Sequence, residues 1–223
     1  APAIFIDQVA RVGGAAAVIG SVGGDAFGKM LRNRLKSDGV ETTHLQTSIK
    51  RTTGTAFVSY FQDGSRTFIF HIEGTAADDL GQCPYLPRGS ILHVSGASLG
   101  NPRIRTFVEG LVKQMKNCGT ISYDPNVRPE LMNDPPTMQA IDQITRHCDI
   151  FLPSAADIAI LYPGKSAENV IKDMLENGKK IVVVKQGVKG VLGSDGSDLI
   201  HVQPHAVKEV DPTGAGDCFC GTL

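Results

Sequence analysis

Residues 211–223 read Asp-Pro-Thr-Gly-Ala-Gly-Asp-Cys-Phe-Cys-Gly-Thr-Leu, a glycine-rich turn that runs into an apolar stretch. The two glycines allow a tight turn, and the residues that follow predict the first turn of a buried helix. The free amides and the positive dipole end of such a helix bind anions, so Gly214, Ala215 and Gly216 are predicted to form an anion hole. The carboxylate of Asp217 is predicted to lie next to the bound anion.

A carboxylate next to an anion hole suits phosphoryl transfer. In that reaction positioning and charge stabilisation do most of the catalysis, and a carboxylate accepts the proton of the attacking hydroxyl. A second interpretation stays open on these residues alone, because Gly-Ala-Gly-Asp is also typical of a glycine turn with a capping aspartate.

The composition indicates a globular enzyme-sized chain. With 223 residues, 41% of them hydrophobic, the chain is long enough for one large α/β domain with a real core. The net charge of −1 and the lack of any Lys or Arg cluster argue against nucleic acid as a partner. The apolar runs are too short to span a bilayer, so no membrane association is expected.

The five cysteines are scattered and include no Cys-x-x-Cys pair, which fits a reducing cytoplasm better than a disulfide framework or a zinc site. We therefore expect a cytoplasmic protein. The sequence opens inside an apolar helical pattern and stops within its last predicted helix, so we also expect an internal part of a longer protein.

The first eighty residues predict a helix, a strand and a helix, followed by a hairpin. The helices are expected at 3–12 and 26–37, with a short buried strand at 15–20. Two β-rich runs, 53–61 and 66–72, are joined by Gln-Asp-Gly-Ser, which is typical of a hairpin turn. Such a hairpin serves either as a sheet edge or as a flap over a ligand.

From residue 90 strands and helices alternate regularly. Strands are predicted at 91–96, 120–123, 149–152 and 180–185, helices at 107–115, 138–148, from 155 and around 170–175, and short edge strands at 192–202 and 207–210. This order predicts a mostly parallel sheet with helices on both faces.

Ligands bind beyond the carboxyl ends of the strands in such sheets. The polar residues expected at that rim are Ser95, Asp124, Asn126, Arg128, Ser154, Asp157, Lys185 and the 211–217 loop.

With these residues laid out, the chain resembles the ribokinase-like (PfkB) family of carbohydrate kinases. Residues 211–217 resemble that family's C-terminal signature, Asp-Thr-Thr-Gly-Ala-Gly-Asp, with Pro212 in place of the first Thr. Residues 23–28, Gly-Gly-Asp-Ala-Phe-Gly, resemble the end of its N-terminal signature. The likeness extends over nearly all 223 residues, without the family's first strand and closing helices. It implies an α/β fold, a three-layer αβα arrangement with a mostly parallel sheet, in a single partial kinase domain over 1–223. The hairpin at about 53–72 would be its lid.

The resemblance also implies roles for the rim residues. Asp217 would be the catalytic base, and Gly214, Ala215 and Gly216 would hold the γ-phosphate of ATP. Residues 124–128 are similar to the Asp-x-Asn-x-Arg segment of fructokinases and 2-keto-3-deoxygluconate kinases. They make Asn126 and Arg128, together with Ser95 and Gly96, candidate substrate-binding residues. A surface ion pair with Glu130 is the alternative role for the arginine.

The resemblance implies that two further segments bind the nucleotide. Residues 154–157, Ser-Ala-Ala-Asp, occupy the place of an Asn-x-x-Glu. They make Ser154 a nucleotide contact and Asp157 a residue that holds Mg²⁺ through water, with helix capping as the alternative. Residues 185–190 match Lys-x-Gly-x-x-Gly, with a plain hairpin turn as the alternative. The predicted nucleotide contacts there and in the last loop are Lys185, Gly187, Gly190 and Thr213. The family likeness adds a monovalent cation such as K⁺ near the loop after Asp211.

The sequence is therefore interpreted as an ATP- and Mg²⁺-dependent kinase of a small keto-sugar or keto-sugar acid, such as fructose, tagatose or 2-keto-3-deoxygluconate, phosphorylated on a primary hydroxyl. Ile4 stands where many members carry an asparagine that contacts the sugar, which leaves the exact sugar open. The rivals are a nucleoside kinase of the same fold and a sensing module without catalysis. A homodimer formed through the lid is expected by analogy.

Overall fold

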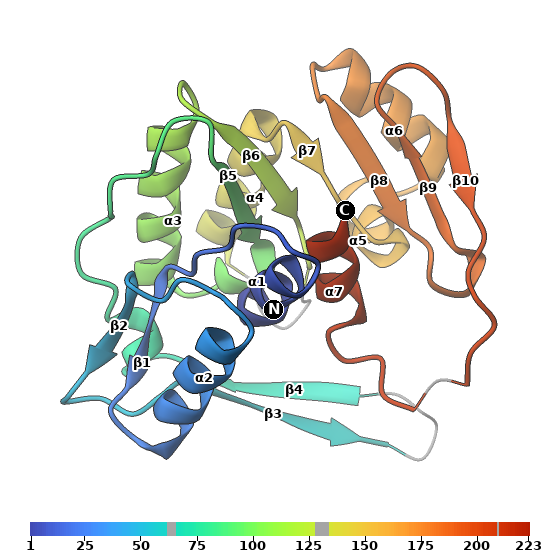
Figure 1. Cartoon of the computed structure of the whole chain (residues 1–223). Helices are drawn as coiled ribbons and strands as arrows, with labels where there is room; N and C mark the ends of the chain where they lie inside the picture. The colour runs from blue at the N-terminus through green and yellow to red at the C-terminus, as the bar shows by residue number, and fades with distance from the viewer. Residues whose placement is uncertain (62–65, 128–133, 209) are drawn as a thin grey trace. The chain divides into compact units, whose positions relative to one another are not determined.

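The computed structural model describes residues 1–61, 66–127, 134–208 and 210–223 (Figure 1). Its contacts group the chain into two compact units, one of Ile6–Pro84 and one of Ala1–Phe5 with Tyr85–Leu223. The sequence-based interpretation of residues 1–223 as one domain stays a prediction.

The unit of residues 6–84 contains most of one helix, a small parallel sheet, a second helix and a hairpin. Its elements, including the helix that begins in the other unit, are α1 (Pro2–Arg11), β1 (Gly20–Gly23), α2 (Ala26–Ser37), β2 (Leu45–Ser48), β3 (Thr55–Tyr60), β4 (Arg66–His71) and the 3₁₀ turn η1 (Ala76–Asp78). Val22, Leu35 and Leu45 are buried in its core, where Ile6 and Val9 from α1 pack against them. Both predicted helices are confirmed.

The strand predicted at 15–20 is wrong in position, because regular pairing starts at Gly20, opposite Leu45 of β2. Before that point Ala17 makes an isolated bridge with Glu41, and Ala16 is buried in the core instead of extending the strand. The hairpin is confirmed, with β3 and β4 paired antiparallel from Thr55–His71 to Tyr60–Arg66. Its predicted turn, 62–65, lies outside the described residues.

The other unit is built on a sheet with the order β10-β9-β8-β7-β6-β5. The strands are β5 (Ile91–Ser95), β6 (Thr120–Asp124), β7 (Ile150–Phe151), β8 (Ile181–Lys185), β9 (Val191–Ser194) and β10 (Ile200–Val202). The first four are parallel to one another and the last two run antiparallel at one edge, so the predicted mostly parallel sheet is confirmed. The edge strand predicted at 207–210 is wrong for 207 and 208, which follow Pro204 and pair with no strand in the described chain. Val207 is 80% exposed there.

Helices cover both faces of this sheet and give three layers. They are α3 (Pro102–Met115), α4 (Pro135–His147), α5 (Ala155–Leu161), α6 (Ala167–Glu176) and α7 (Ala215–Thr222), besides the first residues of α1. Figure 1 shows α7 in front of the sheet and α4 and α6 behind it. The helix predicted from 138 begins three residues earlier, because Asp134 caps it and Pro135 supplies a helical first residue.

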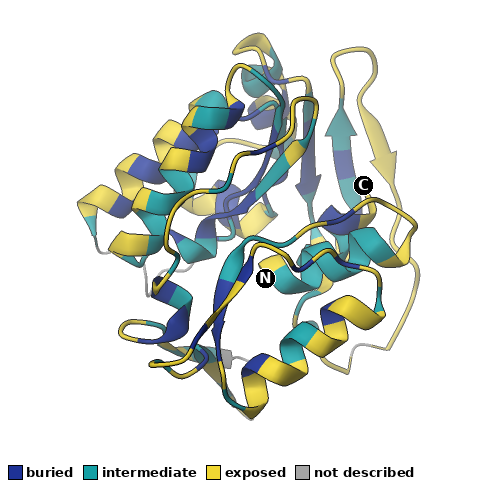
Figure 2. Ribbon diagram, turned by 60° about the vertical axis from the view of Figure 1, so that its left-hand side comes forward, coloured by how far each residue is buried: buried dark blue, intermediate teal, exposed yellow. Residues whose placement is uncertain are grey.

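Successive side chains along each strand point to opposite faces of the sheet, so each face packs against its own layer of helices. Tyr123, Phe151 and Val182 are fully buried, and they point toward the helices on the face of α4 and α6. On the other face Val183 packs with Cys220 of α7 and Phe5 of α1. Figure 2 accordingly shows buried residues on the central strands and exposed ones on the outer sides of the helices.

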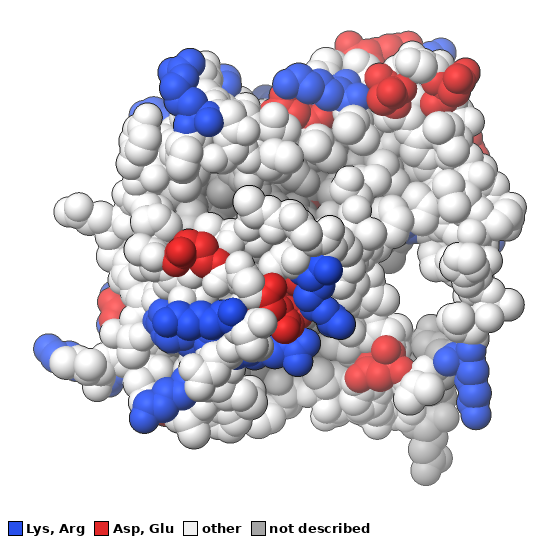
Figure 3. Space-filling model, in the orientation of Figure 1, with Lys and Arg blue, Asp and Glu red and all other residues white. Residues whose placement is uncertain are grey.

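Charged side chains of both signs are intermixed over the face drawn in Figure 3. In the parts of the chain that the structure describes, no helix combines the length and the apolar character needed to cross a membrane.

Candidate active site

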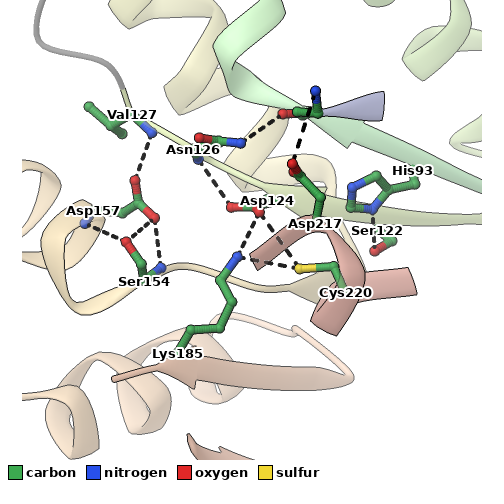
Figure 4. Close-up of polar contacts among 12 residues, drawn as sticks. His93, Ser122, Asp124, Asn126, Val127, Ser154, Asp157, Lys185, Asp217 and Cys220 are labelled. Atoms are coloured by element: carbon green, nitrogen blue, oxygen red, sulfur yellow. Dashed lines mark hydrogen bonds and ion pairs between the residues drawn. The ribbon is translucent and has the colours of Figure 1, made fainter. Parts of the chain in front are cut away.

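Strand ends and helix starts meet at one rim of the larger unit, as the alternation predicted. Ser95 and Asp124 are paired last residues of β5 and β6, and Lys185 ends β8. Ser154, which caps α5, forms a bridge with Lys185. Figure 4 shows the side chains of Asp124 and Lys185 turned toward Cys220 of α7, the helix that also carries Asp217.

The turn before α7 ends at Gly214, and its role as an anion hole stays a prediction. Gly214 adopts a left-handed backbone with φ of 82°, and a Cβ there would meet the Cδ1 atom of Ile4 at 2.7 Å, so only glycine fits well. The amide of Ala215 donates to the carbonyl of Pro212 at 3.1 Å. The next two amides, of Gly216 and Asp217, have no partner inside the helix by position and remain the groups best placed to hold an anion.

The carboxylate of Asp217 lies within the first turn of α7 and keeps 13% of its side chain exposed. Its Oδ2 atom is 4.0 Å from the backbone nitrogen of Ala1. Ala215 and Gly216, the first two residues of α7, are exposed, and Asp217 follows them directly. A partly exposed carboxylate in this position can accept a proton beside a phosphate bound at the helix start.

Behind that turn lies a buried ion pair that joins three elements. The Lys185 Nζ atom is 2.6 Å from Oδ2 of Asp124 and 3.3 Å from Sγ of Cys220. Burial raises the pKa of Asp124, and the Lys185 ammonium opposes that rise. Burial is the largest single influence on the pKa of Lys185 and lowers it, but the charge of Asp124, together with Cys220 and the hydrogen bonds to both residues, outweighs burial and holds this pKa above its usual value. Burial also raises the pKa of the Cys220 thiol to about 12, so this thiol stays protonated.

The segment after β6 forms a strained turn held from two sides. Asn126 has φ of 41° and is the sole non-glycine residue with positive φ in the described ranges. Its amide donates to Asp124 Oδ1 at 3.1 Å, and its Nδ2 atom donates to Ser95 Oγ at 3.3 Å. The amide of Val127 donates to Asp157 Oδ1 at 2.7 Å. Two predicted substrate residues, Ser95 and Asn126, are thus brought together, whereas Arg128 lies outside the described residues.

The Asp157 carboxylate forms a capping box with Ser154 at the start of α5. Its Oδ2 atom accepts from the amide and the hydroxyl of Ser154, each at 2.6 Å, and Ser154 Oγ accepts from the Asp157 amide. The residue is 4% exposed. Of the two roles open from the sequence, the structure contains the capping one, and the water-mediated contact of Asp157 with Mg²⁺ stays a prediction. No group of three or more metal-binding side chains occurs in the described part of the chain.

Replacing Asp157 by Ala is expected to lower the free energy of unfolding by about 2–3 kcal/mol, because the Val127 amide and two donors of Ser154 lose their acceptor. Urea denaturation measures this loss. Ser166→Ala, which removes the N-cap of α6, is the control and should cost about 1 kcal/mol. An Asp157→Ala loss no larger than that of Ser166→Ala would contradict the double role of this carboxylate.

The predicted nucleotide segment after β8 forms a tight connection to β9. Gly187 begins the 3₁₀ turn η4 (Gly187–Lys189), and Gly190 follows it. The amide of Gln186 donates to the carbonyl of Gly190 at 2.8 Å. The antiparallel pairing of β8 with β9 makes this segment a hairpin turn in the structure, and its contact with a nucleotide stays a prediction, as does that of Thr213.

No pattern in the sequence marks His93 as a residue that borders the site. Its ring stacks on Phe5 with centroids 3.6 Å apart, and Nδ1 is 3.1 Å from Ser122 Oγ. Burial, helped by the charge of Lys185, lowers the pKa of His93 to about 3. The ring is therefore neutral in the folded protein.

Because His93 takes up a proton only on unfolding between pH 6.5 and about 3, the free energy of unfolding should fall as pH falls through that window. The contribution of one such group is at most about 1.4 kcal/mol per pH unit. His93→Phe keeps an aromatic ring against Phe5 but cannot titrate, so its stability should depend less steeply on pH. Urea denaturation at pH 7 and pH 5 compares the two proteins, and equal slopes would exclude this role for His93.

Comparisons with known proteins identify a matching family and similar chains. A family profile described as pfkB family carbohydrate kinase matches residues 6–223. The chain is 29% identical to a fructokinase of Salmonella typhimurium and 32% identical to probable fructokinase-5 of Arabidopsis thaliana. These alignments cover all of this chain and 74% and 71% of the relatives.

Solved structures agree with the fold. A putative ribokinase II from E. coli, in its apo form, superposes with a TM-score of 0.88 at 36% identity, covering 99% of this chain and 72% of that one. A second structure of that protein contains ATP and Mg²⁺. A fructokinase double mutant from Vibrio cholerae, bound to fructose, ADP and a potassium ion, superposes with a TM-score of 0.85 at 29% identity and the same coverage. The predicted ribokinase-like fold is confirmed.

Proposed function

Because the chain belongs to the pfkB family of carbohydrate kinases, we propose that it transfers the γ-phosphate of ATP to a primary hydroxyl of fructose or a closely related keto-sugar. The fructokinase names of the relatives support fructose over tagatose and 2-keto-3-deoxygluconate. The observation that carries the proposal is the partly exposed Asp217 in the first turn of α7, next to amides with no helical partner.

In the proposed reaction Asp217 accepts the proton of the sugar hydroxyl. The oxygen so released forms a bond with the γ-phosphorus while the bond from that phosphorus to the bridging oxygen of ADP breaks. The amides of Gly216 and Asp217, at the positive end of α7, stabilise the charge of the transferring group. Gly214 and Ala215 contribute by shaping the turn that presents these amides.

ATP with Mg²⁺ is the proposed cosubstrate, supported by the E. coli structure that contains both. Mg²⁺ bound to the phosphates neutralises part of their charge during transfer. The Asp157 carboxylate, with both oxygens engaged in hydrogen bonds, is proposed to reach the ion only through water, and ATP would supply the direct contacts. A monovalent cation near the loop after Asp211 has its support in the potassium-bound Vibrio cholerae relative.

On the sugar side the proposal uses the Asn126 carboxamide and the Ser95 hydroxyl, which lie within hydrogen-bond distance of each other at the strand ends. Arg128, two residues further along the chain, is proposed to bind the sugar from the motif alone. Gly96, the other residue proposed on this side, follows Ser95 and packs so closely against the carbonyl of Pro125 that a Cβ would overlap it. Ile4, which contacts the glycine turn, adds an apolar surface near the site and favours a sugar whose recognition does not need an asparagine there.

Coupled ADP release by the full-length protein tests the proposal, with fructose, tagatose, 2-keto-3-deoxygluconate and nucleosides as acceptors. We expect the highest kcat/KM on fructose. Turnover confined to nucleosides would replace the proposal with a nucleoside kinase. ATP binding without turnover on any acceptor would leave a sensing module. A homodimer through the β3–β4 hairpin is proposed as well, and sedimentation of the same preparation checks it.

A further inference from the structure

The buried pair of Asp124 and Lys185 connects parts of the site that are distant in sequence. Lys185 keeps 13% and Asp124 4% of the side chain exposed, and their contact joins residues 61 positions apart. Both also reach α7, since Cys220 lies 3.3 Å from Lys185 Nζ and 3.6 Å from Asp124 Oδ2. Figure 4 shows this triangle between the strand ends and the helix.

The same carboxylate also holds the sugar side of the site. While Oδ2 of Asp124 faces Lys185 and α7, its Oδ1 atom accepts from the Asn126 amide at 3.1 Å. That bond supports the left-handed backbone of Asn126, whose side chain donates to Ser95. One carboxylate therefore contacts both the proposed sugar-binding turn and the helix that presents the phosphate amides.

Stability of the fold does not explain an ion pair at this place. Desolvating two charges is unfavourable, and buried pairs are often replaced by apolar residues without loss of stability. The same face of the sheet already packs through Val183, Ile150 and Phe219. The Asp124–Lys185 pair is therefore not needed for stability, yet it lies between the proposed sugar-binding turn and α7. Alignment of these two parts of the site explains the pair better.

We infer that Lys185 and Asp124 are positioning residues that fix the start of α7 against the 124–127 turn, and so set the distance between sugar hydroxyl and γ-phosphate. The inference rests on the proposed function. The role inferred for Lys185 differs from the nucleotide contact expected from the sequence, because the Lys185 ammonium is directed at Asp124 and Cys220. Phosphoryl transfer depends steeply on such alignment, since a displacement of about 1 Å can lower the rate about a hundredfold.

The decisive variant is the double substitution Asp124→Asn/Lys185→Met in the full-length protein. It removes both charges, leaves no unpaired charge behind, and keeps an oxygen for the Asn126 amide. We expect a melting temperature close to that of the wild type. We expect kcat to fall about 10- to 100-fold, with KM for ATP changed by less than about threefold. A merely structural pair would leave kcat as it is once the protein is folded.

Lys180→Met is the matched control. It removes the lysine of the Lys180–Asp149 ion pair, 2.9 Å long, next to the opposite end of β8. Its kcat should equal that of the wild type. A double variant that folds and turns over at the wild-type rate would overturn the inference.

Hydrogen exchange separates this inference from the proposed function. If the pair anchors α7, the hydrogen-bonded amides 218–222 should exchange faster in the double variant than in the wild type and in Lys180→Met. Unchanged exchange there would overturn the inference whether or not the wild-type protein phosphorylates a sugar. Absence of wild-type turnover, with faster exchange in the variant, would remove the kinase proposal alone.

Discussion

Asp217→Asn is expected to lower kcat by about three orders of magnitude, within the range that a general base contributes. The substitution keeps the size and the helix position of the side chain but removes its ability to accept the hydroxyl proton. ATP affinity should change little, because the amides of Gly216 and Asp217 itself are retained.

Steady-state kinetics with fructose and ATP measure the loss of kcat, and binding of a non-hydrolysable ATP analogue measures affinity. Asp195→Asn serves as the control, because Asp195 lies in the exposed connection between β9 and β10 and accepts from the Ser197 amide. A kcat for Asp217→Asn within threefold of the wild type would refute the assigned base, and the proposed mechanism with it.

Gly96→Ala is expected to lower the free energy of unfolding by about 2–3 kcal/mol and to abolish measurable sugar binding. A Cβ at this position would overlap the carbonyl oxygen of Pro125 and approach the Tyr123 hydroxyl at 2.9 Å. The backbone after β5 therefore lies against the backbone of the 124–127 turn. Space for the methyl group requires the turn to move away, and Asn126 moves with it.

Urea denaturation and fructose KM together check this prediction. Gly20→Ala provides the comparison, because the new Cβ would meet only Leu45 Cδ1 at an ordinary 3.6 Å. A Gly96→Ala protein as stable as Gly20→Ala would contradict the close approach of the Gly96 and Pro125 backbones. Normal stability with lost sugar binding would instead favour the direct substrate contact expected from the motif.

The layers of the larger unit were predictable because helical and strand periodicities in that part are regular. The strands that begin at Ile91, Thr120 and Ile181 were located within a residue of their observed bounds. Periodicity failed where pairing partners decide the structure. The apolar run at 15–19 looks like a strand, yet β1 starts only where β2 lies alongside it at Gly20. Val207 looks equally strand-like, but it comes after β10, the edge strand of the sheet, and has no strand to pair with in the described chain.

The rim of the site followed from topology, since strand ends are identifiable from the sequence. What each rim residue contacts was not. Lys185 reads as a nucleotide-binding lysine in its motif, and only the fold brings it to Asp124 across 61 positions. His93 and Cys220 look like ordinary core residues, and no local pattern indicates that they border the site. Asp157 could be a cap or a metal residue by sequence, because both roles need an acidic side chain early in a helix.

The left-handed turn at Asn126 limits how this position can diverge. A left-handed backbone costs most residues roughly 1–2 kcal/mol, and Asn, Asp and Gly are the types that adopt it most readily. Glycine would relieve the backbone but lose the carboxamide that reaches Ser95, and aspartate would place a second negative charge beside Asp124. Homologues that keep this turn should therefore retain asparagine here, even where the sugar they act on has changed.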